Sequence, residues 1–172
     1  YYNDPGNPGS LCNDIVICLF EDSKQGLWIG TNKGLSKYDR KTKSFTSYFH
    51  NENERLNHNT IFYITEDSYG KIWIGTSGGG LIRFNPLSAE YNIYTTEAGL
   101  PNNIVYGIIE DEENCLWLST NGGLAKFYPI GEKFVNYDVK DGIQSYEFNL
   151  GSCMKSEEGY LYFGGVNGFN RF

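Results

Sequence analysis

The chain is poor in several residue types, and each shortage excludes a class of protein. It has only two histidines, His50 and His58, and contains neither His-Glu-x-x-His nor Gly-x-Ser-x-Gly. The sequence therefore carries no zinc-protease or esterase signature. The longest wholly apolar run, Ile15 to Phe20, is far shorter than the ~20 residues that cross a bilayer. No membrane segment is predicted.

Positive charge is also scarce, with 14 Lys and Arg against 21 Asp and Glu and a net charge of −7. Phosphate binding requires a basic surface, so no nucleic-acid partner is expected. The four cysteines, Cys12, Cys18, Cys115 and Cys153, form no Cys-x-x-Cys pair. Zinc sites use close pairs, so we predict free thiols, no bound metal and no other cofactor.

Aromatic residues and glycines, by contrast, are abundant, at 16% aromatic and 21 Gly. No segment keeps an apolar period of 3.6 residues, so short strands joined by tight turns are expected. The chain begins at Tyr1 without an initiator Met, a basic leader or an apolar leader. We therefore expect a piece of a longer protein.

An internal repeat organises the chain. Three segments read nearly alike around Trp28, Trp73 and Trp117, which recur at intervals of 45 and 44 residues. A divergent fourth copy carries Tyr162 in the Trp position, another 45 residues on. A repeat of this length indicates a solenoid or a propeller.

The middle repeat distinguishes between these two architectures. It contains apolar stretches at 61–64, 71–76 and 81–84 and another that ends near Tyr94, separated by short polar turns. Four short strands in ~45 residues are typical of a propeller blade. The predicted fold is all-β, a partial β-propeller of just under four blades built from four-stranded antiparallel sheets. The predicted units are an outer-strand remnant at 1–14, blade repeats at 15–59, 60–103 and 104–148, and a partial closing blade at 149–172.

The sheet of a blade is covered by neighbours on both faces, which explains the aromatic content. Trp28, Trp73, Trp117 and Tyr162 are predicted as the structural core of the repeats, because one residue type at one repeated position indicates packing. Glycines follow two residues after three of them, at Gly30, Gly75 and Gly164, and allow close approach of neighbouring strands. Ser119 replaces the glycine in the third repeat.

The repeated pattern is Glu-Asp, a turn, Leu-Trp-Ile-Gly-Thr, a glycine turn, Gly-Leu and Phe-x-x-Tyr. It resembles the two-component regulator propeller repeat over nearly the whole chain, and Glu147 to Phe169 looks like the closing blade of that family. The resemblance implies a periplasmic sensor region of a hybrid two-component histidine kinase that recognises an oligosaccharide. It also implies further domains, including a kinase, a receiver and a helix-turn-helix, none of which is present here.

Strand direction brings two loops of each blade to the same end, the loop before the first strand and the loop between the second and third. Amides and aromatic rings in such loops suit sugar hydroxyl groups. The alternative is turn chemistry, because Asn often caps turns. The predicted ligand-binding residues are Asn32, Asn59, Asn103, Asn121, Tyr146 and Asn167. The opposite end gathers the acidic turns, of which Glu66 and Asp67 are typical; we interpret them as solvated turns rather than a cation site.

Three functions remain open. The first is ligand sensing without catalysis, with the remaining propeller blades and a second copy of the chain as partners, since open blade faces expose apolar surface. The second is a catalytic propeller, a glycan lyase or hydrolase, although no carboxylate pair is singled out. The third is a structural platform for dimerisation.

Overall fold

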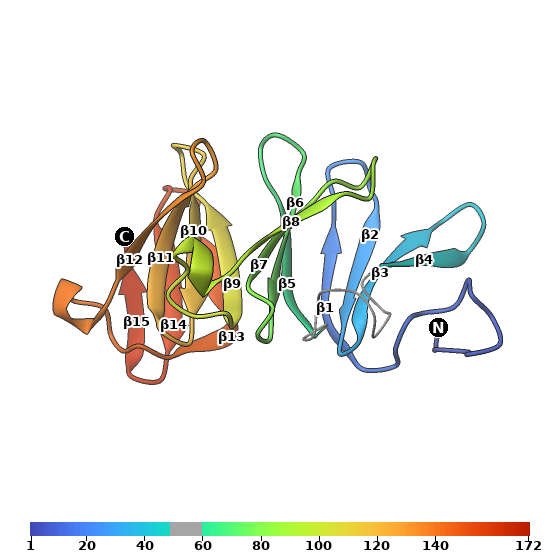
Figure 1. Ribbon diagram of the computed structural model, residues 1–172, viewed down its shortest axis with the longest axis horizontal. Coiled ribbons are helices and arrows are strands. Elements are labelled where there is room, and N and C mark those ends of the chain that lie inside the picture. The colour runs from blue at the N-terminus through green and yellow to red at the C-terminus, as the bar shows by residue number, and fades with distance from the viewer. Residues whose placement is uncertain (49–59) are drawn as a thin grey trace.

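The computed structural model describes residues 1–48 and 60–172 and is built from four antiparallel sheets. Figure 1 shows them following one another in chain order, from the blue sheet to the red one. We call them blades 1 to 4. The prediction of a partial β-propeller is confirmed.

Each of the first three blades has four strands in chain order, and blade 4 has three. Blade 1 comprises β1 (Val16–Glu21), β2 (Leu27–Thr31), β3 (Gly34–Asp39) and β4 (Ser44–Tyr48). Blade 2 comprises β5 (Ile61–Glu66), β6 (Ile72–Thr76), β7 (Leu81–Phe84) and β8 (Tyr91–Tyr94). Blade 3 comprises β9 (Val105–Glu110), β10 (Leu116–Thr120), β11 (Gly123–Tyr128) and β12 (Lys133–Tyr137). Blade 4 comprises β13 (Phe148–Lys155), β14 (Leu161–Gly165) and β15 (Gly168–Arg171).

The first strands of the blades, β1, β5, β9 and β13, contact one another in sequence and form the inner edge of the array. Two 3-10 turns, η1 (Thr96–Ala98) and η2 (Val139–Asp141), follow blades 2 and 3. No helix of the described residues has the length and apolarity needed to cross a membrane.

The second strand of each blade lies in the middle of the packing. Trp28 and Trp73 are fully buried, Trp117 is buried, and Tyr162 of blade 4 is half-buried. All five residues of β6 are buried, as are all five of β10. This continuous burial follows from a sheet that is covered on both faces.

A hydrogen bond within each blade fixes the tryptophan. The Trp28 indole N–H donates to Asp22 Oδ2 (2.8 Å), and Trp73 and Trp117 donate in the same way to Asp67 (2.7 Å) and Asp111 (2.9 Å). The other carboxylate oxygen of each Asp accepts two backbone amides of the same turn, those of Lys24 and Gly26 in blade 1. The acidic turn therefore serves the core, because it satisfies buried donors that would otherwise cost free energy.

Two glycines allow the blades to approach each other. A Cβ atom on Gly30 would lie 2.8 Å from Ile61 of the next blade, and one on Gly75 would lie 2.7 Å from the carbonyl oxygen of Val105. In blade 3, Ser119 takes the glycine position, and Gly107 lies directly opposite on β9. The small residue has thus moved to the partner strand. Ser119 Oγ is buried without a hydrogen-bond partner among the described residues.

Two further hydrogen bonds join consecutive blades. The amide and hydroxyl of Ser23 donate to the carboxylate of Glu66 in blade 2 (2.6 and 3.0 Å). The amide and hydroxyl of Ser68 donate to Glu110 in blade 3 (2.9 and 2.8 Å). We call this Ser-to-Glu pair the interblade latch. It connects turns 42 or 43 residues apart, one repeat along the chain.

Residues 1–14, expected to contain the remnant of an outer strand, form turns and no strand in this structure. A strand requires a hydrogen-bonded neighbour, and here the segment packs through side chains instead. Leu11 joins a small core with Ile29 and Phe45 of blade 1. The Tyr1 ring lies 5.1 Å from that of Tyr38.

We expect Asp67→Ala to lower the free energy of unfolding by about 2–3 kcal/mol, because it leaves the buried Trp73 indole and two turn amides without an acceptor. Urea denaturation followed by tryptophan fluorescence measures the loss. Asp39→Ala is the matched control, since Asp39 accepts turn amides at the exposed surface. Equal losses for the two variants would contradict a core role for the acidic turn.

Candidate functional site

The loops that carry the predicted ligand residues meet at one end of the blades. Within each of the first three blades, backbone hydrogen bonds join the loop after the second strand to the segment before the first. The amide of Asn32 donates to Ile15, that of Ser77 to Thr60, and that of Asn121 to Ile104. Each blade therefore offers a paired loop at this end, which we call the loop end.

Two of the predicted asparagines have structural roles. Asn32 Oδ1 accepts a hydrogen bond from the Thr60 hydroxyl of blade 2 (3.1 Å). Asn103 Oδ1 accepts the Thr96 amide at the start of η1 (2.8 Å). Their oxygens are thus engaged by the fold, which is the turn chemistry weighed as the alternative.

The other predicted residues are open to solvent. Asn121 and Asn167 are exposed, and their side chains have no hydrogen-bond partner among the described residues. Tyr146 is 48% exposed, and its carbonyl accepts the Gly123 amide in the blade 3 loop. Blades 3 and 4 therefore present free amides and a phenol at the loop end. Asn59 lies outside the described residues, as do His50 and His58.

An aromatic pair that the sequence analysis did not identify lies next to these loops. The Phe62 and Tyr106 rings stack with centroids 5.9 Å apart and an interplanar angle of 13°. Each sits where its strand departs from regular pairing with the second strand, between Ile61 and Tyr63 in blade 2 and opposite the Ser119–Thr120 step in blade 3. Such a bulge redirects a side chain, and both rings are half-buried.

A carboxylate lies near this pair. Burial raises the pKa of the Tyr106 phenol, and the negative charge of Glu147 raises it further. Glu147 follows Tyr146 in the segment that leads into β13. The loop end of blades 2 to 4 thus combines a stacked aromatic surface, free amides and a carboxylate. These groups suit a neutral polyhydroxylated ligand, which needs both donors and acceptors.

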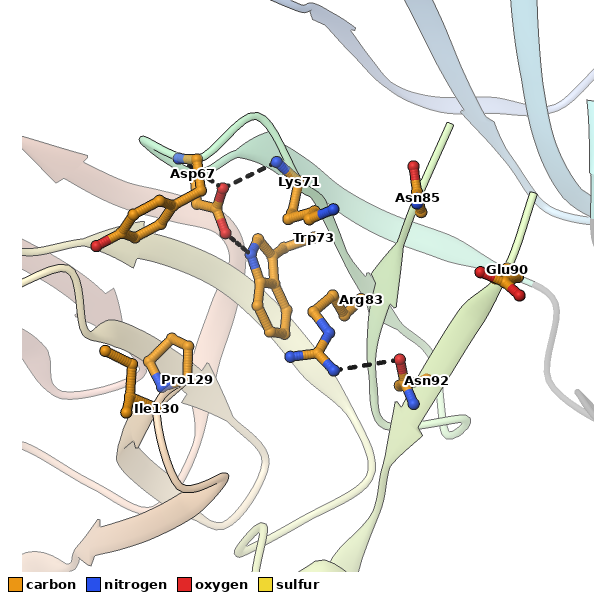
Figure 2. A pocket seen from close by; sticks show the side chains of 10 residues that line it. Asp67, Lys71, Trp73, Arg83, Asn85, Glu90, Asn92, Pro129 and Ile130 are labelled. Atoms are coloured by element: carbon orange, nitrogen blue, oxygen red, sulfur yellow. Dashed lines mark hydrogen bonds between the residues drawn. The ribbon is translucent and has the colours of Figure 1, made fainter. Parts of the chain in front are cut away.

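The largest cleft of the described chain lies at the opposite end, between blades 2 and 3, with a volume of about 520 Å³. Figure 2 shows Pro129 and Ile130 of blade 3 facing Trp73 and Arg83 of blade 2 across it. Its charged groups are already paired: Asp67 binds the Trp73 indole, and Arg83 binds Asn92 and Glu132 (3.2 and 3.0 Å). A smaller-scored hollow occupies the same place on blade 1, beside Lys37, which also lies over a tryptophan. We interpret the cleft as a product of blade packing.

One cluster at this end resembles a metal site, formed by Asp111, Glu113 and Cys115. The Lys126 ammonium already lies 2.8 Å from both carboxylates. Burial disfavours the charge on Lys126, but hydrogen bonds to Asp111 and Glu113 outweigh it and raise the pKa of the amine. Lysine thus supplies the cation of the cluster.

Comparison with known proteins identifies the repeat. The two-component regulator propeller family model matches residues 10–33, 55–78 and 99–122. A protein named histidine kinase P4 from Formosa agariphila is 33% identical over 174 residues, which cover 98% of this chain and 13% of that protein. The chain thus spans about an eighth of this curated relative.

Solved structures give the same picture. The extracellular domain of the hybrid two-component system BT3049 from B. thetaiotaomicron has a TM-score of 0.86 and 30% identity, over 100% of this chain and 23% of that one. The corresponding domain of BT4673 has a TM-score of 0.81 and 25% identity, over 99% and 24%. Virginiamycin B lyase from Staphylococcus aureus, at 18% identity and a TM-score of 0.69 over 91% and 55%, shares the fold alone.

We expect stability to fall at acidic pH. Burial opposes ionisation of Asp22 and Asp111, but hydrogen bonds from Trp and turn amides and a nearby Lys outweigh it and lower the pKa of both carboxyls. A lowered pKa stabilises the fold above the unfolded value of about 4, and this contribution is lost as the pH falls through and below that value. Urea unfolding between pH 7 and 3 measures this slope.

The Asp111→Asn variant should show a shallower loss of stability below about pH 4.5 than the unchanged chain, because it has one carboxylate fewer to protonate. Glu97→Gln, in the exposed η1 turn, is the control with the same chemical change. An identical slope for Asp111→Asn and the unchanged chain would contradict the assignment.

Proposed function

We propose that this chain, which belongs to the two-component regulator propeller family, is part of the ligand-sensing region of a sensor histidine kinase, on the periplasmic side of the membrane. The similarity to extracellular domains of hybrid two-component systems and to a histidine kinase supports this role. Kinase activity would belong to other parts of such a protein.

We further propose an oligosaccharide as the ligand, bound at the loop end of blades 2 to 4. The observation that carries this proposal is the stacked pair of Phe62 and Tyr106 beside the exposed loops of Asn121 and Tyr146. A sugar ring presents an apolar face that packs on an aromatic ring and hydroxyl groups that bind amides. The carboxylate of Glu147, close to Tyr106, adds a strong acceptor for hydroxyl groups.

Signal transmission then requires only a difference in affinity. If the ligand binds one arrangement of the sensor more tightly than another, it shifts the population toward that arrangement. Loops that belong to different blades, here Asn121 in blade 3 and Asn167 in blade 4, are suited to this task because a ligand that spans them responds to their relative position. Control of genes for carbohydrate use would be the output of such a system.

We expect Asn121→Ala to weaken oligosaccharide binding about tenfold, the equivalent of one hydrogen bond of ~1.4 kcal/mol. The melting temperature should remain nearly unchanged, because the side chain is exposed and without a protein partner. Isothermal titration calorimetry against a panel of oligosaccharides, with differential scanning fluorimetry, measures both quantities. Asn103→Ala is less suitable because it also removes the acceptor of the Thr96 amide.

Asn92→Ala provides the matched control, since Asn92 lines the cleft at the opposite end and should leave binding unchanged. Phe62→Ala should abolish detectable binding by removing half of the aromatic stack. Unchanged affinity in both Asn121→Ala and Phe62→Ala would refute the loop-end site, and loss of affinity in Asn92→Ala alone would transfer it to the cleft of Figure 2.

A further inference from the structure

A group of three aromatic rings recurs at each junction between consecutive blades. It consists of the Trp of one blade, the Tyr that ends or follows its outer strand, and an aromatic residue on the third strand of the next blade. The groups are Trp28, Tyr48 and Phe84; Trp73, Tyr94 and Phe127; and Trp117, Tyr137 and Phe172. Phe172 directly follows β15. Each junction therefore has the same aromatic contacts, with ring centroids 4.9–6.1 Å apart.

Two of these three rings are present on the outer face of blade 1. Tyr1 packs on Tyr38 and Phe45 at 5.1 and 5.3 Å. Tyr94 packs in the same way on Phe127 and Phe134 at the junction of blades 2 and 3. Tyr1 thus takes the place of the Tyr from a preceding outer strand, and no tryptophan of the described residues completes this group.

The same face exposes apolar residues that are buried elsewhere in the repeat. Val16 and Leu19 of β1 are 43% and 66% exposed. Their counterparts in blade 2, Ile61 and Ile64, are 1% and 5% exposed because blade 1 covers them. A free face of this kind in one blade, covered in the next two, marks a contact surface.

The acceptor of the interblade latch is present on this face as well. Glu21 occupies the position at which Glu66 and Glu110 accept the Ser23 and Ser68 donors. Here its side chain is 53% exposed and pairs only with Arg40, which is itself 57% exposed. Exposed pairs of this type contribute little to stability, so Arg40 does not prevent Glu21 from accepting another donor.

We propose that the outer face of blade 1, formed by Val16, Leu19, Glu21 and Tyr38, binds a further blade of this same repeat. That blade carries a tryptophan, which completes the aromatic group with Tyr1 and Tyr38. It also carries a serine or threonine five residues before the tryptophan, as Ser23 and Ser68 precede Trp28 and Trp73. This donor binds the Glu21 carboxylate.

Charge excludes blade 4 of a second copy as this partner. Glu157 stands five residues before Tyr162, in the donor position, and its turn has the same backbone hydrogen bonds as the acidic turns, such as Ser156 to Tyr160. Docked on blade 1, it would place a carboxylate against Glu21, and like charges in contact disfavour a partner. The face therefore selects a blade with a neutral donor.

An extended chain tests this inference. A copy of residues 60–93 is placed directly before Tyr1, so that Tyr1 follows the added Ile93 as Tyr94 does in blade 2, and the whole present chain is kept. The added blade supplies Trp73 and Ser68. We expect the melting temperature to rise by about 4 °C or more, since ~1 kcal/mol corresponds to 2–4 °C at this size. Hydrogen exchange of the Leu19 amide region should slow at least tenfold.

A mutant cycle isolates the latch. Ser68→Glu in the added copy should remove much of the gain in melting temperature, and Glu21→Gln should restore part of it. Ser88→Glu in the same copy, in an exposed turn, is the control of equal charge and should have little effect.

Three outcomes would overturn the proposal. In the first, the extended chain melts at the same temperature as the present one, with no added protection of β1. In the second, Ser68→Glu costs no more than Ser88→Glu. The third is a dimer of the unextended chain, seen by sedimentation velocity, that Leu19→Glu dissociates; it would assign the face to a second copy.

Discussion

The hydrogen bond from the tryptophan indole to the aspartate of the preceding turn is the contact on which each blade depends. A strand buried on both faces leaves its central indole N–H without access to water. The Asp carboxylate accepts this N–H through one oxygen and two turn amides through the other. One side chain thus holds the core residue and closes the hairpin, because all of these donors would otherwise be unsatisfied.

Contacts between blades are built from the same short segment. The residue before the Asp accepts the latch from the preceding blade, and the residue after it donates to the following one, as Glu66 and Ser68 do. Blade 4 departs from this pattern, since Lys155 occupies the Glu position and its amine donates to the Glu110 carbonyl. A different residue set at this junction distinguishes blade 4 from the others and favours a fixed order of blades.

Rigid blades leave the loops as the variable part of the molecule, which is the usual division between scaffold and function. At the loop end, some asparagines maintain the loops and others face solvent. The bulges at the start of β5 and β9 add an aromatic surface to this end. The proposed ligand site thus rests on elements whose position is set by packing, and this reduces the free energy needed to order them on binding.

The sequence by itself determined the blade repeat, its four strands and the core position of the tryptophans, because these depend on local alternation and on a period that survives divergence. It also placed the asparagines at one end. Only the tertiary structure separated Asn103, engaged with Thr96, from Asn121, which is free. It alone revealed the Phe62 and Tyr106 stack, since a bulge breaks the alternation from which side-chain direction is inferred. The role of Glu21 also required the structure, because the latch joins residues one repeat apart.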